Sequence, residues 1–139
     1  MKTKITVIGI GREGKEGLGQ RARDAIAAAD QLWGSEALLA LFPDVSAPRI
    51  RIDRSIRTQL LRLANRGDNE KVVMLGSGDP LFHGIASTLL RELPAEELVI
   101  LPQPSYLQEA CALSGVSWED MVFLSAHTGI GTKNHVFPA

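Results

Sequence analysis

The segment from Lys71 to Leu93 constrains the fold of this chain more than any other. Its first five residues predict a short buried strand, because Val72-Val73-Met74-Leu75 is an unbroken apolar run. The run Gly76-Ser77-Gly78-Asp79-Pro80 follows directly, and residues 81–93 have the pattern of an amphipathic helix. We expect Ser77 or Asp79 to cap that helix and Pro80 to occupy its first turn. A glycine-rich turn at the carboxyl end of a strand places exposed backbone amides where open α/β sheets bind ligands.

Strand and helix patterns alternate along the rest of the chain. Strands are expected at residues 5–8 (closed by Gly9), 31–33, 72–75, 98–101 and 122–124, with a strand or extended edge at 49–53. Helices are expected at residues 20–29, 36–42, 55–64, 81–93 and 106–113. Helices between short, evenly apolar strands predict an α/β fold with a parallel sheet covered on both faces, an α/β/α sandwich. Residues 129–139 have no periodicity, so we expect one domain over residues 1–128 followed by a linker or loose tail.

Composition narrows the class of protein. A chain of 139 residues with a net charge of −1 offers no bulk attraction to nucleic acid or to a membrane surface. Its single cysteine, Cys111, excludes an intramolecular disulfide, fits a reducing compartment and is expected to be a small core residue. No apolar run approaches the ~20 residues of a membrane span, and Ile5–Ile10 is too short for a signal peptide. We therefore expect a cytoplasmic protein without nucleic-acid or membrane partners.

Three loops of unusual composition follow predicted strands. They are Gly9–Gly14, Gly76–Pro80 and Leu101–Tyr106. Loops that follow parallel strands emerge at one edge of the sheet, so these three are expected to meet in space. Together they offer glycines, prolines, hydroxyls and the carboxylate of Asp79, which suits a polar ligand of nucleoside size and supplies no obvious nucleophile. A purely structural alternative stays open, in which the second loop is a strand-to-helix turn and Ser105 is only an N-cap.

The first loop has the form G-x-G-x-x-G, which is also the dinucleotide fingerprint. Glu36 lies at about the expected ~20 residues beyond it. The fingerprint requires a helix to open within the glycine run, whereas Gly14, Gly17 and Gly19 continue it here, and each glycine costs a helix ~1 kcal/mol relative to alanine. The helix must begin later, which disfavours a nicotinamide enzyme.

Other polar residues give weaker signals. Arg49, Arg51, Arg54, Arg57, Arg62 and Arg66 cluster within a short span. Arginine suits carboxylates, but these side chains do not form one stripe, so a solvated helix face is the favoured interpretation. His83 is expected just inside the start of the 81–93 helix, lining the cleft, and His127 and His135 are too isolated to predict a metal site.

The loop motifs together resemble the tetrapyrrole methylases. The resemblance rests on Gly9-Ile10-Gly11, on Gly14–Leu18 with Ala22-Arg23, on Ser77–Ile85 and on Pro102–Ser105, and it extends from about Ile5 to His127. The pieces Gly17-Leu18 and Leu81-Phe82-x-Gly84-Ile85 favour the precorrin-6Y C5,15-methyltransferase branch, specifically its C5-methylating part. Two departures stand out: Arg12-Glu13-Gly14 replaces the Gly-Pro-Gly of many relatives, and Ala37 stands where that branch often has arginine.

The resemblance implies methylation of a precorrin carbon in cobalamin biosynthesis with S-adenosylmethionine as cofactor. It implies cofactor contacts at Ser77, Gly78, Asp79, Phe82, Ser105 and Tyr106, with Gly11 nearby, and it assigns no catalytic base and no metal. Family members hold the cofactor between two α/β domains and are expected to form homo-oligomers, here a homodimer. The second domain has no counterpart in these residues, so little activity is expected from this chain alone. Two alternatives remain: a non-catalytic module that binds a nucleoside-like ligand or dimerises, and a fragment of a nicotinamide enzyme.

Overall fold

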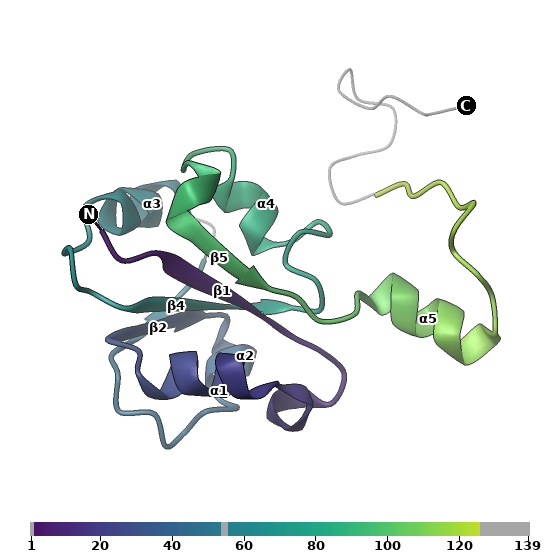
Figure 1. Ribbon diagram of the computed structural model, residues 1–139, viewed down its shortest axis with the longest axis horizontal. Coiled ribbons are helices and arrows are strands. Elements are labelled where there is room, and N and C mark those ends of the chain that lie inside the picture. Colours follow the sequence, from purple (N-terminus) through teal and green to yellow (C-terminus); the bar gives the residue numbers. More distant parts are fainter. Residues whose placement is uncertain (1, 54–55, 126–139) are drawn as a thin grey trace. The chain divides into compact units, whose positions relative to one another are not determined.

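The computed structural model describes residues 2–53 and 56–125 of the chain. The chain divides into two compact units, one that runs through Ser105 and one that begins at Tyr106. The first unit contains the whole sheet (Figure 1). The second contains the helix α5 (Tyr106–Ser114), in which Cys111 is buried, as predicted, with its Sγ 4.0 Å from the Sδ of Met121. The predicted tail, residues 129–139, lies outside the described residues.

The first unit is built on one parallel sheet. Its strands are β1 (Ile5–Ile10), β2 (Gln31–Gly34), β3 (Arg49–Arg51), β4 (Val72–Ser77) and β5 (Leu98–Leu101). They lie in the order β3-β2-β4-β1-β5, and every pair of neighbours is parallel. The predicted strands of this unit are therefore confirmed, and the segment near residue 50 is a strand. Strand β1 lies between β4 and β5, the two strands whose loops were predicted to meet its own.

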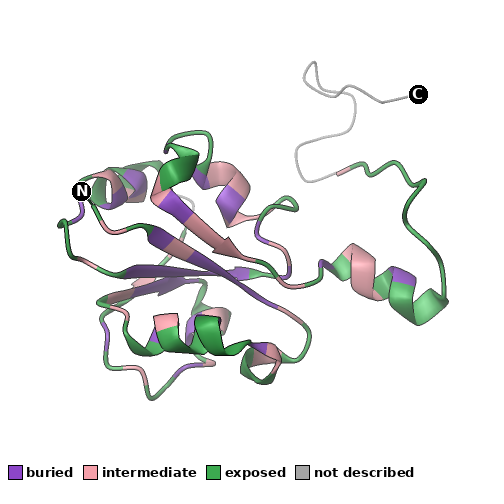
Figure 2. Ribbon diagram, viewed as in Figure 1, coloured by how far each residue is buried: buried purple, intermediate pink, exposed green. Residues whose placement is uncertain are grey.

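Helices cover both faces of the sheet, as predicted for an α/β/α sandwich. They are α1 (Gln20–Ala27), α2 (Glu36–Leu39), α3 (Ile56–Ala64) and α4 (Ile85–Leu89), with 3₁₀ turns η1 (Gly14–Gly17) and η2 (Ala95–Glu97). Side chains alternate along the strands, so β1 sends Ile5 and Val7 to the α3/α4 face and Ile8 and Ile10 to the α1/α2 face. Figure 2 shows the result: strands that are mostly buried, with the exposed residues of this unit mainly on helices and loops.

The helix predicted over residues 81–93 is wrong in extent. Helix α4 begins only at Ile85, and its N-cap is Gly84 instead of Ser77 or Asp79. The Asp79 carboxylate accepts a hydrogen bond from the Leu81 amide at 2.9 Å, and the Asp79 carbonyl accepts one from the Phe82 amide at 3.0 Å. These bonds close a turn, which delays the helix because aspartate side chains compete for backbone amides.

Two other helices end earlier than predicted, and one predicted strand is wrong. Helix α1 ends at Ala27 and α2 at Leu39, beyond which the chain continues in turns. Val122-Phe123-Leu124 is not a strand. These three residues belong to the second unit, and within the described ranges they pair with no strand. Three apolar residues in succession do not specify a strand without a neighbour to bond with.

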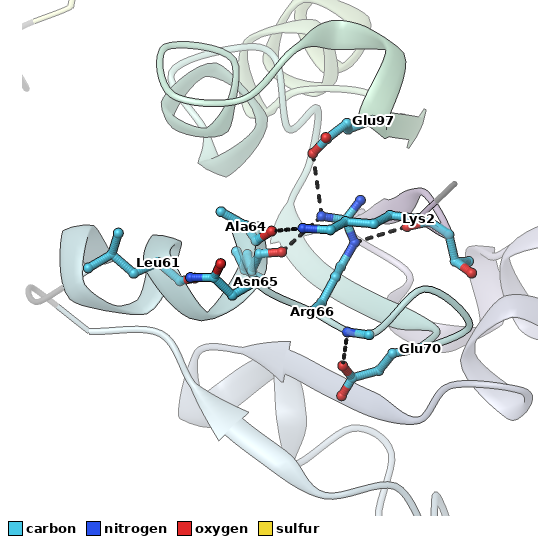
Figure 3. Close-up of polar contacts among 10 residues, drawn as sticks. Lys2, Leu61, Ala64, Asn65, Arg66, Glu70 and Glu97 are labelled. Carbon is cyan, nitrogen blue, oxygen red and sulfur yellow. Dashed lines mark hydrogen bonds and ion pairs between the residues drawn. The ribbon is translucent and has the colours of Figure 1, made fainter.

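Arg66 is buried, so the interpretation of the arginine-rich span as a solvated face is wrong for this residue, whereas Arg51, Arg57 and Arg62 are exposed as that interpretation expects. Its side chain is 1% exposed, and Nε donates to the Thr3 carbonyl at 2.9 Å. Nη1 donates to the Leu63 carbonyl at 2.8 Å and lies 3.4 Å from the Glu97 carboxylate, while Nη2 has no partner. Figure 3 shows this cluster, in which Lys2 also donates to the Ala64 carbonyl. Arg66 thus joins the start of the chain to the end of α3 and to η2.

We predict that the carbonyl bonds of Arg66 matter more than its ion pair. Arg66→Met leaves the part-buried Thr3 bond and the buried Leu63 bond without their donor and should lower the free energy of unfolding by roughly 1–3 kcal/mol. Glu97→Gln keeps an acceptor and removes only a partly exposed charge, so it should cost less than about 1 kcal/mol. Urea denaturation of both variants measures the difference. Equal losses in the two variants would contradict this assignment.

Candidate functional site

The three predicted loops meet at the carboxyl edge of the sheet, beside Gly9. The Gly78 amide donates to the Ile10 carbonyl at 2.8 Å, and the Gln103 amide donates to the Gly78 carbonyl at 3.4 Å. A Cβ atom added to Gly9 would lie 2.1 Å from the Gly78 oxygen and 2.8 Å from the Gln103 nitrogen. Both atoms belong to the backbone, so no side chain can move aside to make room. Only glycine at this position lets the three loops approach one another.

Gln103 fastens the third loop to the first, a role that the sequence analysis did not assign. Its Nε2 donates to the Gly17 carbonyl at 2.9 Å, and its side chain passes beside Gly11, where an added Cβ would be 3.4 Å from the Gln103 Cβ. A signal was present in Pro102-Gln103-Pro104, since the two prolines have no amide to donate and Gln103 between them has both a backbone and a side-chain amide.

The first loop is longer than a dinucleotide fingerprint allows. The Gly14 amide donates to the Gly11 carbonyl at 3.1 Å, the 3₁₀ turn η1 follows, and the α-helix begins only at Gln20 with Gly19 as its N-cap. The predicted late start of the helix is confirmed. A pyrophosphate bound by the fingerprint rests on a helix that opens within the glycine run, and here that helix is displaced.

Several backbone amides in and just after the second loop form hydrogen bonds within the protein. The amides of Gly78, Leu81 and Phe82 all bond within the protein, so the expectation of exposed amides is wrong for these three. Gly78 has φ +60°, a left-handed conformation that glycine adopts without strain. Asp79 is half-buried and uses Oδ1 to hold the turn. The loop is thus a rigid platform and not an open row of donors.

Side chains supply the groups that this platform presents to solvent. Ser77 is exposed, and Phe82 is 37% exposed with its ring edge-on to the His83 ring, at 4.9 Å between centroids and 72° between planes. His83 has φ +53°, the one positive value among the non-glycine residues that the structure describes. It precedes helix α4 instead of lying inside it, which corrects its predicted position.

The strain at His83 is imposed by the turn around Pro80. The Ala86 amide donates to the Pro80 carbonyl at 3.0 Å, and Ser87 Oγ donates to the Leu81 carbonyl at 3.0 Å. A Cβ on Gly84 would lie 2.7 Å from the Pro80 oxygen, so the chain turns here at its closest possible approach. A backbone held this firmly can keep a residue in an unfavourable conformation and present its ring to a ligand.

The predicted site residues fall into two groups. Gly11, Ser77, Gly78, Asp79 and Phe82 lie on the first unit's carboxyl edge, and the loop bonds bring their segments together. Ser105, the last residue of that unit, is buried, with 5% of its surface exposed. Tyr106 is 71% exposed and begins the second unit, so its contact with the cofactor stays a prediction.

Over residues 2–53 and 56–125, no three His, Cys, Asp or Glu side chains gather closely enough to hold a metal ion. In those same ranges, no helix is long and apolar enough to span a bilayer.

We predict that Gly9 is required for the loops to assemble. Gly9→Ser places a Cβ against two backbone atoms and should lower the free energy of unfolding by about 1–3 kcal/mol, the cost of overpacking. Gly19→Ser is the matched control, because an added Cβ meets nothing within 4 Å there and serine is a good N-cap. It should be neutral or slightly stabilising in a thermal melt. A tolerated serine at position 9 would show that the loops do not meet as described.

We also predict a definite order of stability at position 83. His83→Gly removes the cost of a left-handed residue with a Cβ, ~1–2 kcal/mol, which exceeds the ~0.5–1 kcal/mol that glycine adds to the entropy of the unfolded chain. His83→Val should be the least stable variant, because β-branched residues tolerate this conformation worst. Chemical denaturation gives the order Gly above His above Val. A valine variant as stable as the glycine variant would refute the left-handed conformation.

The chain is similar in sequence to a known family and to known proteins. The family model of the Tetrapyrrole (Corrin/Porphyrin) Methylases matches residues 4–136. The cobalt-precorrin-7 C(5)-methyltransferase of Salmonella typhimurium is 37% identical over 123 residues, which are 88% of this chain and 61% of that protein. The precorrin-6Y C(5,15)-methyltransferase (decarboxylating) of Mycobacterium tuberculosis is 36% identical over 125 residues, 89% of this chain and 32% of that protein.

A solved structure agrees with these matches. The precorrin-6Y methylase of Archaeoglobus fulgidus superposes with a TM-score of 0.65 at 26% identity, covering 83% of this chain and 59% of that one. The matches confirm the resemblance inferred from the loop motifs. In each comparison the chain spans less than two thirds of the length of the protein that it resembles.

Proposed function

This chain belongs to the tetrapyrrole (corrin/porphyrin) methylase family, and we propose that it forms the cofactor-binding part of a precorrin C-methyltransferase of cobalamin biosynthesis. The observation that carries the proposal is the meeting of three loops beside Gly9, on the edge where open α/β sheets bind ligands. The names of the relatives support the same reaction class, since both curated relatives are C(5)- or C(5,15)-methyltransferases acting on precorrins.

The side chains on this edge fit S-adenosylmethionine by their chemistry. An adenosyl group needs acceptors for its ribose hydroxyls, a polar partner for its base and an apolar surface for the ring. The Asp79 carboxylate has a second oxygen besides the one that holds the turn, Ser77 offers an exposed hydroxyl, and Phe82 offers an exposed ring. Ser105 and Tyr106 are assigned to the same site by the family resemblance.

The chemistry of the reaction agrees with the absence of an assigned base. S-adenosylmethionine, when bound, supplies an electrophilic methyl group. The protein's task is then to hold two reactants in line and to exclude water, and orientation alone can account for ~7–11 kcal/mol of the barrier. The rigid turn at Gly78–Gly84 serves this task, because it fixes Asp79 and Phe82 before any ligand arrives.

That the substrate is a precorrin is part of the proposal and rests on the relatives, not on a contact in the structure. The chain spans 61% of the Salmonella relative and 32% of the mycobacterial one, so binding of the cofactor is the property to test here, and little turnover is expected from this chain alone. A homo-oligomeric state and a cytoplasmic location likewise remain predictions. Arginine side chains on the unit would suit the carboxylates of a corrin precursor.

We predict that Asp79→Asn weakens cofactor binding without weakening the fold. Asparagine keeps an oxygen for the Leu81 amide but replaces the other carboxylate oxygen with a donor, so an acceptor for the cofactor is lost. Hydrogen bonds to charged groups are worth ~1.5–3 kcal/mol, which predicts at least about a tenfold rise in Kd for S-adenosylhomocysteine. Isothermal titration calorimetry measures it beside a thermal melt.

Asp30→Asn is the matched control. The Asp30 carboxylate also accepts a backbone amide, that of Lys71 at 2.8 Å, but it lies at the amino end of β4. It should leave the Kd for S-adenosylhomocysteine unchanged. Equal affinity in wild type and Asp79→Asn would remove Asp79 from the site. Wild-type protein that self-associates but binds no S-adenosylhomocysteine would favour the dimerisation module instead.

A further inference from the structure

A pocket lies on the α1/α2 face of the first unit, and none of the predicted cofactor contacts lines it. It has a volume of about 310 Å³, at the lower end of the range for small-molecule sites. Buried Leu18, Ile26 and Phe42 contribute its apolar floor. The remaining lining residues are Lys15, Glu16, Arg23, Ala27 and Val45.

The turn η1 separates this pocket from the proposed cofactor site. On one side of the turn, the Gly17 carbonyl accepts the bond from Gln103 of the third loop. Lys15 and Glu16 of the same turn line the pocket. None of the residues predicted to contact the cofactor is among those that line it, so the two sites are distinct.

Arg49 holds the wall of the pocket in place. Helix α2 is only four residues long, and the segment beyond it would otherwise rest on few backbone bonds. The Arg49 guanidinium donates to the Leu39 carbonyl at 2.6 Å, to the Phe42 carbonyl and to the Val45 carbonyl at 3.4 Å. Phe42 and Val45 are therefore fixed as a wall before any ligand binds, and a preformed pocket loses less entropy on binding.

The rim of the pocket carries an excess of positive charge. Lys15 and Arg23 are exposed cations, against the single carboxylate of Glu16. Arg23 Nη2 donates to the Glu16 carbonyl at 3.4 Å, which holds the guanidinium at the rim. We propose that this pocket binds a small amphiphilic monoanion, with its aromatic or aliphatic body on the apolar floor and its carboxylate or sulfonate paired with Lys15 and Arg23.

The dye 8-anilinonaphthalene-1-sulfonate has this chemistry and serves as the probe. Fluorescence titration of the full chain should show one saturable site. Arg23→Glu should raise the Kd of that site at least tenfold, whereas Arg21→Glu, which is also exposed on the same helix but does not line the pocket, should change it less than twofold. The neutral analogue N-phenyl-1-naphthylamine, which has the same body without the sulfonate, should bind at least tenfold more weakly.

A second pair of variants tests the location without touching the charges. Ala27 lines the pocket and is exposed, so Ala27→Phe should fill the hollow and abolish the saturable site. Ala28→Phe, at the next and also exposed position, does not line it and should leave binding intact. Thermal melts of both variants report whether the fold survives the added ring.

Four results would overturn the proposal. Equal effects of the two charge reversals, or equal affinity for the neutral and anionic dyes, would remove the role of Lys15 and Arg23. Equal effects of the two phenylalanine variants would move the dye to another surface. Sedimentation velocity distinguishes a different occupant: a dimer lost in Ala27→Phe but kept in Ala28→Phe would show that a second copy of the chain fills the pocket.

Discussion

The approach of three backbone segments at Gly9 is the constraint on which the rest of the site depends. It follows from the strand order, because β1 lies between β4 and β5 and the loops after these strands must leave the sheet side by side. Hydrogen bonds then join Ile10 to Gly78 and Gly78 to Gln103. A Cβ on residue 9 would lie 2.1 Å from the Gly78 oxygen and 2.8 Å from the Gln103 nitrogen, so the bond between these two atoms could not keep its geometry. The strand order therefore decides which loops are neighbours, and the absence of a side chain at Gly9 lets them come this close.

The same closeness decides how a ligand can be recognised on this edge. The loop after β4 uses the amides of Gly78, Leu81 and Phe82 to hold itself in shape, so these amides are not offered to a ligand. In the function proposed above, recognition would therefore rest on side chains, chiefly those of Ser77, Asp79 and Phe82, on a backbone that the loop bonds already hold in place. Methyl transfer depends on the alignment of two reactants, and a rigid support of this kind costs little entropy on binding.

The short strands and the late start of α1 were predictable from the sequence, whereas the turn that delays α4 and the burial of Arg66 were not. Apolar runs such as Val72–Leu75 specify buried strands directly. The glycines from Gly14 to Gly19 correctly predicted that α1 begins late. The predicted start of the helix after Pro80 was wrong because the Asp79 carboxylate accepts a bond from the Leu81 amide. Apolar periodicity does not reveal this local competition. The predicted exposure of Arg66 was wrong for a different reason. Its partners Thr3 and Glu97 are 63 and 31 residues away in sequence, so a local pattern does not reveal them.

The turn η1 connects the two sites through one local feature of the sequence. Gly14 and Gly17 bound a four-residue 3₁₀ turn, and Gly19 caps the helix that follows. A helix that opened at Gly11 would leave no such turn, and with it no carbonyl at Gly17 for Gln103 and no rim formed by Lys15 and Glu16. The glycines that disfavour a dinucleotide site therefore shape the turn that contacts Gln103 and lines the pocket. A change within η1 acts on the loop platform and on the pocket together, because the turn is a wall of each.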